Sequence, residues 1–302
     1  REAVELKAVE PTASAAAAAG APSFKVAAAA DAGARCDCSA LSVGLAQFGS
    51  LMRRDAVLWF RQLSVKAIDV GTTMVCAVVL GFAAQGTTAS GVIINSVITM
   101  GMLATLFMGM LSVVWAIEFI NSMRATANRE AGGGVPPLLI YSSKILQNSV
   151  VDTLLRPLVF TILHYNIALP RMPFWEFFVV MFGVALSTTG LGYLIAVVSP
   201  PSMALVFGLI ICFAFGGILN GFSPYLNDLP HPLVAFPSYA RWAVEAISIR
   251  EFAQVDDWST DYGLQLVGYS YDNWGVALLW LFVSGLVLRA VTYPLFRRIC
   301  LQ

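Results

Sequence analysis

Two long stretches of the sequence contain no charged residue, and they constrain the fold more than any other feature. The first is 48 positions long, residues 70–117, and the second is 51 positions long, residues 177–227. About 20 residues are enough for a helix to cross the hydrocarbon core of a bilayer. Each stretch is therefore too long for one span, and the chain is predicted to be an all-α membrane protein that crosses the bilayer several times.

Each uncharged stretch carries its own interruption. QGTTASG at residues 85–91 breaks the first, and VSPPS at residues 198–202 breaks the second with two prolines that cannot continue a helix. Two further apolar segments bring the prediction to six transmembrane helices, so both termini lie on one side of the membrane. The expected spans are residues 67–85, 91–117, 148–168, 174–198, 202–222 and 274–296.

Lysine and arginine select which side that is. If the termini are cytoplasmic, nine basic residues flank the inner ends of the spans and three lie in outer segments. An excess of basic residues on the inside favours this orientation, in the plasma membrane or an intracellular membrane. The inner residues are Arg53, Arg54, Arg61, Lys66, Arg124, Arg129, Lys144, Arg297 and Arg298, and the outer ones are Arg171, Arg241 and Arg250. The net charge of zero gives no indication of nucleic-acid binding.

The region before the first span has two parts. Residues 1–40 are rich in alanine without apolar periodicity, so we expect a cytoplasmic linker. Because the chain begins with Arg instead of Met, we also expect that a further segment precedes it. Residues 41–66 repeat apolar side chains at helical spacing, opposite several arginines. Such a basic amphipathic helix is expected to lie in the membrane interface, and a soluble helix packed on another domain is the alternative.

Two connections between the predicted spans are long enough to have a function. Residues 118–144 are polar and basic, and the glycines and prolines at residues 132–137 predict a helix, a sharp turn and a short second helix. Docking of a cytoplasmic partner is one role for such a loop. The outer segment 223–273 contains a second amphipathic helix, PSYARWAVEAISIREF. There Ser238 is the predicted N-cap, and a polar stripe runs through Arg241, Glu245 and Ser248.

The chain lacks the residues that most chemistry requires. It has two histidines far apart, no metal-binding motif and no phosphate-binding Gly-x4-Gly-Lys-Ser/Thr loop, so we expect no catalytic residue, metal or bound cofactor. Carriers coupled to protons or sodium usually need ionisable groups near mid-membrane, and the uncharged stretches supply none. The energy for transport is therefore expected from a cytoplasmic ATPase. Arg156, inside the third span, is either a functional ion or a structural anchor.

Three motifs, in this order and spacing, resemble the G subfamily of ABC exporters, the white or pleiotropic-drug-resistance type. They are VVLGF at residues 78–82, REAGGG at residues 129–134 and ARWAVEA…REF within residues 240–252. The resemblance covers residues 43–302 and implies the six-span, ABC-2 type membrane domain of a half-transporter. It also implies that residues 238–252 form a helix re-entering the outer leaflet, with Arg241 and Glu245 facing protein or a water-filled vestibule. A helix that caps the outer surface is the alternative.

The resemblance implies functional residues as well. A coupling helix at residues 128–144 would receive the stroke of a nucleotide-binding domain, and Glu118 would pair with Arg53, Arg54 or Arg61. The implied coupling residues are Glu118, Arg129, Glu130, Tyr141 and Lys144. The implied substrate slot at the dimer axis is lined by Phe107, Met108, Leu111, Ile210, Phe213 and Ala214. Phe222 would be its outer gate, and Gly208, Gly216 and Gly217 would allow close packing at the dimer seam.

Residues and resemblance together predict the membrane part of an ATP-driven exporter of lipids, sterols or other amphipathic molecules. It would work by alternating access as a homodimer or heterodimer, with ATP and Mg bound by a nucleotide-binding domain outside this sequence. The alternatives are a channel or carrier that works without ATP, and a membrane scaffold that transports nothing.

Overall fold

Helices make up every regular element of the part of the chain that the structure describes. The structure is a computed structural model that describes residues 38–61, 63–89, 94–219, 238–254 and 268–300. Its α-helices are α1 (Cys38–Arg61), α2 (Leu63–Ala89), α3 (Ile94–Gly132), α4 (Pro137–Asn148), α5 (Arg156–Ala168), α6 (Phe174–Val198), α7 (Pro201–Phe213), α9 (Tyr239–Phe252) and α11 (Trp274–Cys300). Two π-helical segments, η1 (Ser149–Leu155) and η2 (Ala214–Ile218), and one 3₁₀ turn, η4 (Tyr271–Asn273), complete them. Phe222 and nearly all of the predicted linker lie outside the described residues.

Five helices of the described residues are long and apolar enough to cross a membrane. They cover Lys66–Gln85, Ser96–Gly132, Phe174–Val198, Pro201–Ile218 and Tyr271–Arg298. The chain is therefore an integral membrane protein. The predicted span at residues 148–168 is not among the five, and its residues are divided between the end of α4, η1 and α5.

Pro157 accounts for that division. A proline ring clashes with the carbonyl group four residues earlier and donates no hydrogen bond, so a regular α-helix cannot run through it undisturbed. The chain is π-helical up to Leu155 and becomes α-helical at Arg156, the residue before the proline. A wider π turn is a common way to absorb such a disturbance without breaking the helix.

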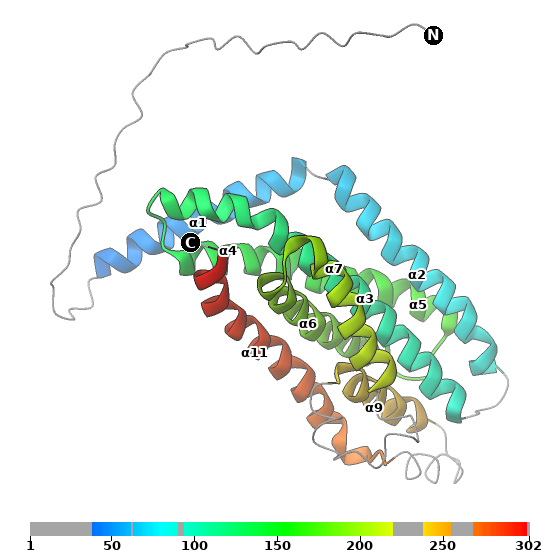
Figure 1. Ribbon diagram of the computed structural model, residues 1–302. Helices are drawn as coiled ribbons and strands as arrows, with labels where there is room; N and C mark the ends of the chain where they lie inside the picture. The colour runs from blue at the N-terminus through cyan, green and yellow to red at the C-terminus, as the bar shows by residue number, and fades with distance from the viewer. Residues whose placement is uncertain (1–37, 62, 90–93, 220–237, 255–267, 301–302) are drawn as a thin grey trace, which may run out of the picture. The chain divides into compact units, whose positions relative to one another are not determined.

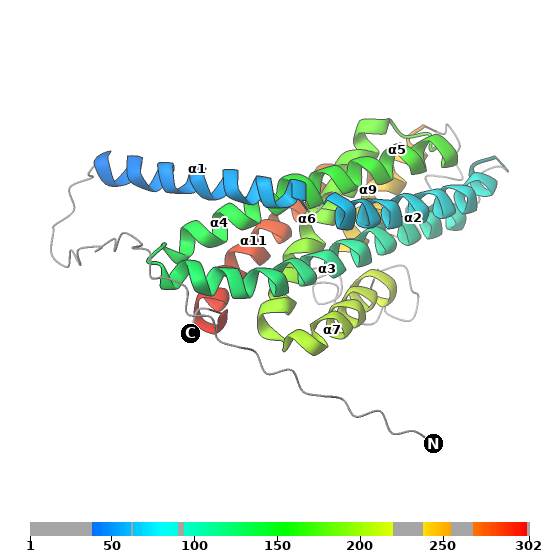
Figure 2. The same cartoon turned by 90° about the horizontal axis from the view of Figure 1, so that it is seen from above.

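The helix α6 forms the centre of the helical bundle. It packs against α11, α3, α5, α9 and α7, and 72% of its most apolar 18-residue window is buried. The helices α1 and α4 lie at one end of the bundle, together with the C-terminal end of α11 (Figures 1 and 2). The helix α9 lies at the opposite end (Figures 1 and 2).

Small residues allow α6 to approach its neighbours closely. A Cβ atom at Gly190 would lie 2.9 Å from the carbonyl oxygen of Gly285 on α11. On the other side of α6, a Cβ atom at Gly192 would lie 2.6 Å from the Cβ atom of Ala116 on α3. Such contacts between small residues are how helices pack in a membrane, where the hydrophobic effect does not drive helices together.

The glycines predicted for a dimer seam serve packing within the chain instead. A Cβ atom at Gly208 would lie 2.3 Å from Ile117 Cδ1 on α3, and one at Gly216 would lie 2.3 Å from the Tyr239 hydroxyl on α9. Both glycines are buried. The seam prediction is therefore wrong for these two positions, because their close approach is already used by helices of the same chain.

Candidate functional site

The helices α3 and α4 form a hairpin at the end of the bundle where α1 lies. The α3 helix ends in hydrogen bonds from Gly133 N to Arg129 O (3.0 Å) and from Val135 N to Glu130 O (3.2 Å). Gly134 has a φ of 86°, a backbone conformation that residues with a side chain rarely adopt. Pro137 is the first residue of α4, where its fixed φ suits the start of a helix. The predicted helix, sharp turn and second helix are confirmed, and the motif REAGGG contains the last four residues of α3 and the first two of the turn.

A buried ionic network fastens this hairpin to α1. Lys144 Nζ on α4 lies 2.9 Å from both carboxylate oxygens of Asp55 on α1. Arg54 donates to Asp55 at 2.9 Å and also pairs with Glu130 at the end of α3. Lys144 Nζ lies 3.7 Å from Glu130 Oε1. We call Arg54, Asp55, Glu130 and Lys144 the hairpin network.

Burial makes the buried members of the hairpin network depend on their partners. Asp55 is 4% exposed and Lys144 is 8% exposed, so removing either partner would leave a charge without compensation inside the protein. Partial burial alone would lower the pKa of Arg54, but hydrogen bonds to Asp55 and Glu130 raise it above its ordinary value. Three helices, α1, α3 and α4, are thus held together at one end of the molecule.

The ion pair predicted for Glu118 is not observed in the described residues. We expected Glu118 to pair with Arg53, Arg54 or Arg61, but Arg54 pairs with Asp55 and Glu130. Within the described residues, Glu118 forms no ion pair. The reason is geometric, since α3 continues as one helix to Gly132 and carries Glu130, not Glu118, to the level of Arg54.

The other predicted coupling residues differ in their surroundings. Arg129 is exposed at the end of α3. Tyr141 is buried, and its hydroxyl donates to the carbonyl oxygen of Arg289 on α11 at 2.8 Å. Burial raises the pKa of that hydroxyl above its ordinary value, so it stays neutral and keeps its proton for this bond. Tyr141 and Lys144 therefore bind the hairpin to the bundle instead of lying on its surface.

A second ionic cluster surrounds Arg156. Its Nη2 atom lies 2.9 Å from Asp152 Oδ1 and 3.7 Å from Asp69 Oδ2, and its guanidinium group lies 4.3 Å from the centre of the Trp115 ring. Lys66 adds longer pairs, at 3.7 Å to Asp152 and 3.9 Å to Asp69. The cluster connects α2, α3, η1 and α5, so of the two alternatives for Arg156 the geometry favours the structural anchor.

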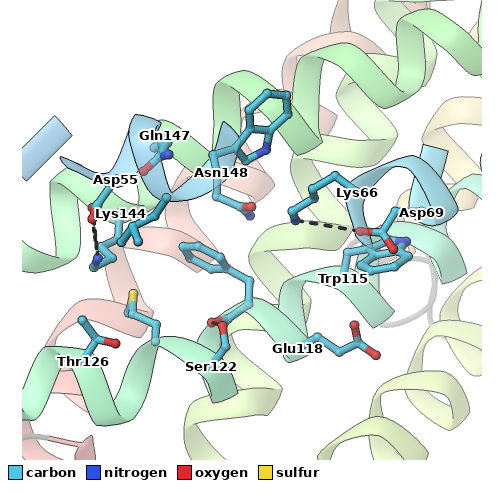
Figure 3. Close-up of a pocket in the computed structure, with 14 residues that line it drawn as sticks. Asp55, Lys66, Asp69, Trp115, Glu118, Ser122, Thr126, Lys144, Gln147 and Asn148 are labelled. Atoms are coloured by element: carbon cyan, nitrogen blue, oxygen red, sulfur yellow. Dashed lines mark hydrogen bonds and ion pairs between the residues drawn. The ribbon is translucent and has the colours of Figure 1, made fainter. Parts of the chain in front are cut away.

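A cavity of about 320 Å³ lies between the hairpin network and this second cluster. Its wall comes from α1, α2, α3 and α4. Asp55 and Lys144 lie at one end, and Lys66, Asp69, Trp115 and Glu118 lie at the other (Figure 3). The rest of the wall is Leu58, Trp59, Phe119, Ser122, Met123, Thr126, Gln147 and Asn148.

The polar stripe of α9 lies inside the protein. Ser238 caps the helix as predicted, since its Oγ atom accepts a hydrogen bond from Arg241 N at 3.2 Å. Arg241 lies 3.7 Å from Glu245 and over the ring of Tyr269, and Asn273 donates to Glu245 at 3.2 Å. Arg241 and Glu245 are 7% and 1% exposed. We expected these two side chains to face either protein or a water-filled vestibule, and in the described residues they face protein.

The residues predicted to line a substrate slot do not form one surface. Phe107, Ile210 and Phe213 are exposed on α3 and α7, two helices that pack side by side. Leu111 and Ala214 are partly buried. Met108 is fully buried in the core, so its prediction as a wall residue does not fit this conformation. Met108 fills a gap between helices, which is a common use of this flexible side chain.

Our reading of the sequence missed Arg289, which is 8% exposed inside the last candidate span. Its guanidinium group donates to the carbonyl oxygens of Leu186 and Gly285, at 2.5 and 3.0 Å, and to the hydroxyl of Thr189. It forms no ion pair with a carboxylate of the described residues. The sequence alone could have identified this residue, because an arginine inside an apolar helix requires hydrogen-bond or ionic partners within the membrane.

Comparison with known proteins gives two findings. The family model described as "ABC-2 type transporter" matches residues 29–299. The white-brown complex homolog protein 30 of Arabidopsis thaliana is 22% identical over 240 residues, a region that covers 77% of this chain and 21% of that protein. The match therefore spans about a fifth of the length of this relative.

Proposed function

Because this chain belongs to the ABC-2 type transporter family, it is the membrane component of a transporter. We propose that this transporter is an ATP-driven exporter. The proposed cargo is a lipid, a sterol or another amphipathic molecule. The chain would work as a dimer by alternating access at the dimer axis, with ATP and Mg on a nucleotide-binding domain outside these residues. Similarity to a white-brown complex homolog supports a transporter of the G subfamily.

The hairpin network is the observation that carries this proposal. A nucleotide-binding domain must push on a rigid element if its closure is to move the spans. The α3–α4 hairpin suits this role, because one arm is the end of a candidate span and the other is tied to α1 through Asp55 and Lys144. Arg129, exposed at the tip, is available for a contact with that domain.

The distribution of charge supports a cytoplasmic position for the hairpin end. Basic residues gather on α1, on the end of α3 and at the C-terminal end of α11, which lie together at this end (Figure 1). Such a concentration favours the cytoplasmic side. We propose that η1 and α5 together form a sixth span, since residues 149–168 number 20, and that α9 re-enters the outer leaflet.

Phe107, Ile210 and Phe213 are the proposed walls of the slot. They are 38%, 59% and 48% exposed and belong to neighbouring helices. A second copy that contributed the same residues would close an apolar slot at the axis. Leu111 and Ala214 lie at its margin, Met108 would join it only after a movement of α3, and Phe222 stays a predicted gate.

The coupling of ATP hydrolysis to transport tests the proposal. In the full-length encoded protein, reconstituted in proteoliposomes, Glu130→Gln removes one charge of the hairpin network. We expect more ATP hydrolysed per molecule of fluorescent lipid moved, because the hairpin then transmits less of the stroke. Glu176→Gln is the matched control, since Glu176 pairs with Arg250 at 3.3 Å, away from the hairpin.

The same assay separates the alternative functions. Equal ratios for Glu130→Gln, Glu176→Gln and the unchanged protein would contradict a coupling role for the hairpin. Movement of lipid at the same rate without nucleotide would indicate an ATP-independent channel or carrier. Absence of any movement, with or without ATP, would indicate a scaffold.

A further inference from the structure

The cavity beside the hairpin network is not explained by the proposed function. The proposed slot lies on α3 and α7, whereas this cavity is lined by residues of α1, α2, α3 and α4. Its volume of about 320 Å³ falls within the range of sites for small ligands. Aromatic rings of Trp59, Trp115 and Phe119 contribute to the wall, next to several charged groups.

The charges around the cavity do not balance. Three carboxylates and two ammonium groups line it, namely Asp55, Asp69, Glu118, Lys66 and Lys144. Asp55 is neutralised by Lys144 at 2.9 Å. Asp152 and Arg156, just behind the wall, neutralise each other at 2.9 Å. One negative charge therefore remains, on Glu118, which is exposed and forms no ion pair within the described residues.

The carboxylate of Asp69 gives an independent indication of a missing partner. Asp69 is 2% exposed, yet its Oδ2 atom accepts no hydrogen bond. Its nearest cationic atoms, on Arg156 and Lys66, lie 3.7 and 3.9 Å away, beyond hydrogen-bonding distance. A buried carboxylate oxygen without a donor is costly, so a donor brought by a ligand would stabilise this site.

We propose that the cavity binds the ammonium group of a lipid headgroup. An ammonium group donates hydrogen bonds, neutralises the excess charge at Glu118 and packs favourably against aromatic rings. A lipid is favoured over a soluble amine because the wall residue Leu58, on the amphipathic helix α1, is apolar and 42% exposed. Acyl chains can lie against Leu58 while the headgroup enters the cavity.

Such a site would make the hairpin sensitive to the surrounding lipid. Asp55 and Lys144 belong both to the cavity wall and to the hairpin network, so an occupied cavity would hold α1 and α4 in the observed arrangement. Binding requires only this chain, whether or not it belongs to an exporter. It is measured without nucleotide, so its failure is distinguishable from failure of the proposed function.

Native mass spectrometry of the purified full chain tests the site. The probes are phosphatidylethanolamine and phosphatidylglycerol with identical acyl chains, which share a phosphate and differ in the ammonium group. We expect phosphatidylethanolamine to bind about tenfold more tightly, as one charge-assisted hydrogen bond would give. Glu118→Gln should abolish this preference, and the control Glu176→Gln should keep it.

A second measurement guards against a folding defect in the variant. Phosphatidylethanolamine should raise the thermal unfolding midpoint of the unchanged chain and of Glu176→Gln more than phosphatidylglycerol does. Equal effects of the two lipids, or an unchanged preference in a folded Glu118→Gln, would overturn the proposal. Soluble ethanolamine should compete only at far higher concentration, and competition at equal concentration would overturn the assignment to a lipid.

Discussion

Apart from the first turn of α6, which contains Glu176, the helices α6 and α7 come from the same uncharged stretch. They are joined by two residues, yet they have opposite surroundings. In the most apolar window of each candidate span, 72% of the α6 residues are buried but only 22% of those in α7 and η2. The middle of α6, residues 183–192, is rich in small side chains, whereas α7 has fewer of them. The α6 helix carries Gly183, Ser187, Thr188, Thr189, Gly190 and Gly192, whereas α7 presents Leu205, Val206, Phe207, Ile210 and Phe213 at its surface.

This comparison shows that an apolar sequence is enough for a helix to cross the membrane. It does not determine whether the helix lies at the centre or at the edge of the bundle. Small side chains let backbones approach each other, and the hydroxyl groups of α6 find partners at that range. Thr189 donates to Ala185 O at 2.7 Å and accepts from Arg289, while Ser187 lies 2.8 Å from Ser284 on α11. Large side chains on α7 instead leave an apolar face for lipid or a second copy.

The largest expected effect comes from truncating one large side chain on each helix. Tyr193 on α6 is fully buried and accepts a hydrogen bond from Asn148, whereas Phe213 on α7 is 48% exposed. Tyr193→Ala should lower the free energy of unfolding by about 4 kcal/mol, because it leaves a cavity in the core. Phe213→Ala should lower it by less than about 1 kcal/mol. Thermal unfolding in detergent measures both, and equal losses would contradict the different surroundings of α6 and α7.

A cross-linking experiment, in which we expect no loss of stability, tests whether a second copy covers the exposed face of α7. Ile210→Cys should form a disulfide with a second copy, because a residue near a two-fold axis meets its own counterpart. Leu286→Cys on α11 is the control, since Leu286 is also 59% exposed but lies on a helix that contributes nothing to the proposed slot. Cys36, Cys38 and Cys300 are first changed to Ser. Gel electrophoresis after mild oxidation reads the result, and cross-linking through Leu286→Cys alone would place the seam on α11.

Much of the fold could be predicted because its signals are local. The prolines at positions 200 and 201 separate two spanning helices, REAGGG gives the turn of the hairpin, and Ser238 caps α9. Each of these depends on a few neighbouring residues and on backbone preferences that hold in any surroundings.

The ionic clusters could not be predicted in the same way. Arg156 meets Asp69 from another helix, and Lys144 meets Asp55 from a helix 89 residues earlier. Sequence position gives no indication of such partners, because helix packing alone brings them together. For the same reason Met108 was expected at a surface, although it is fully buried against neighbouring helices.

The dependence of uphill transport on nucleotide tests the central proposal most directly. The full-length encoded protein is reconstituted in proteoliposomes, and movement of a labelled amphiphile against its gradient is measured with ATP, without nucleotide, and with a non-hydrolysable analogue. We predict net uphill movement only with ATP and Mg, because residues 70–117 and 177–227 supply no charged side chain that could couple transport to a gradient. Sustained uphill movement without nucleotide would contradict the proposal.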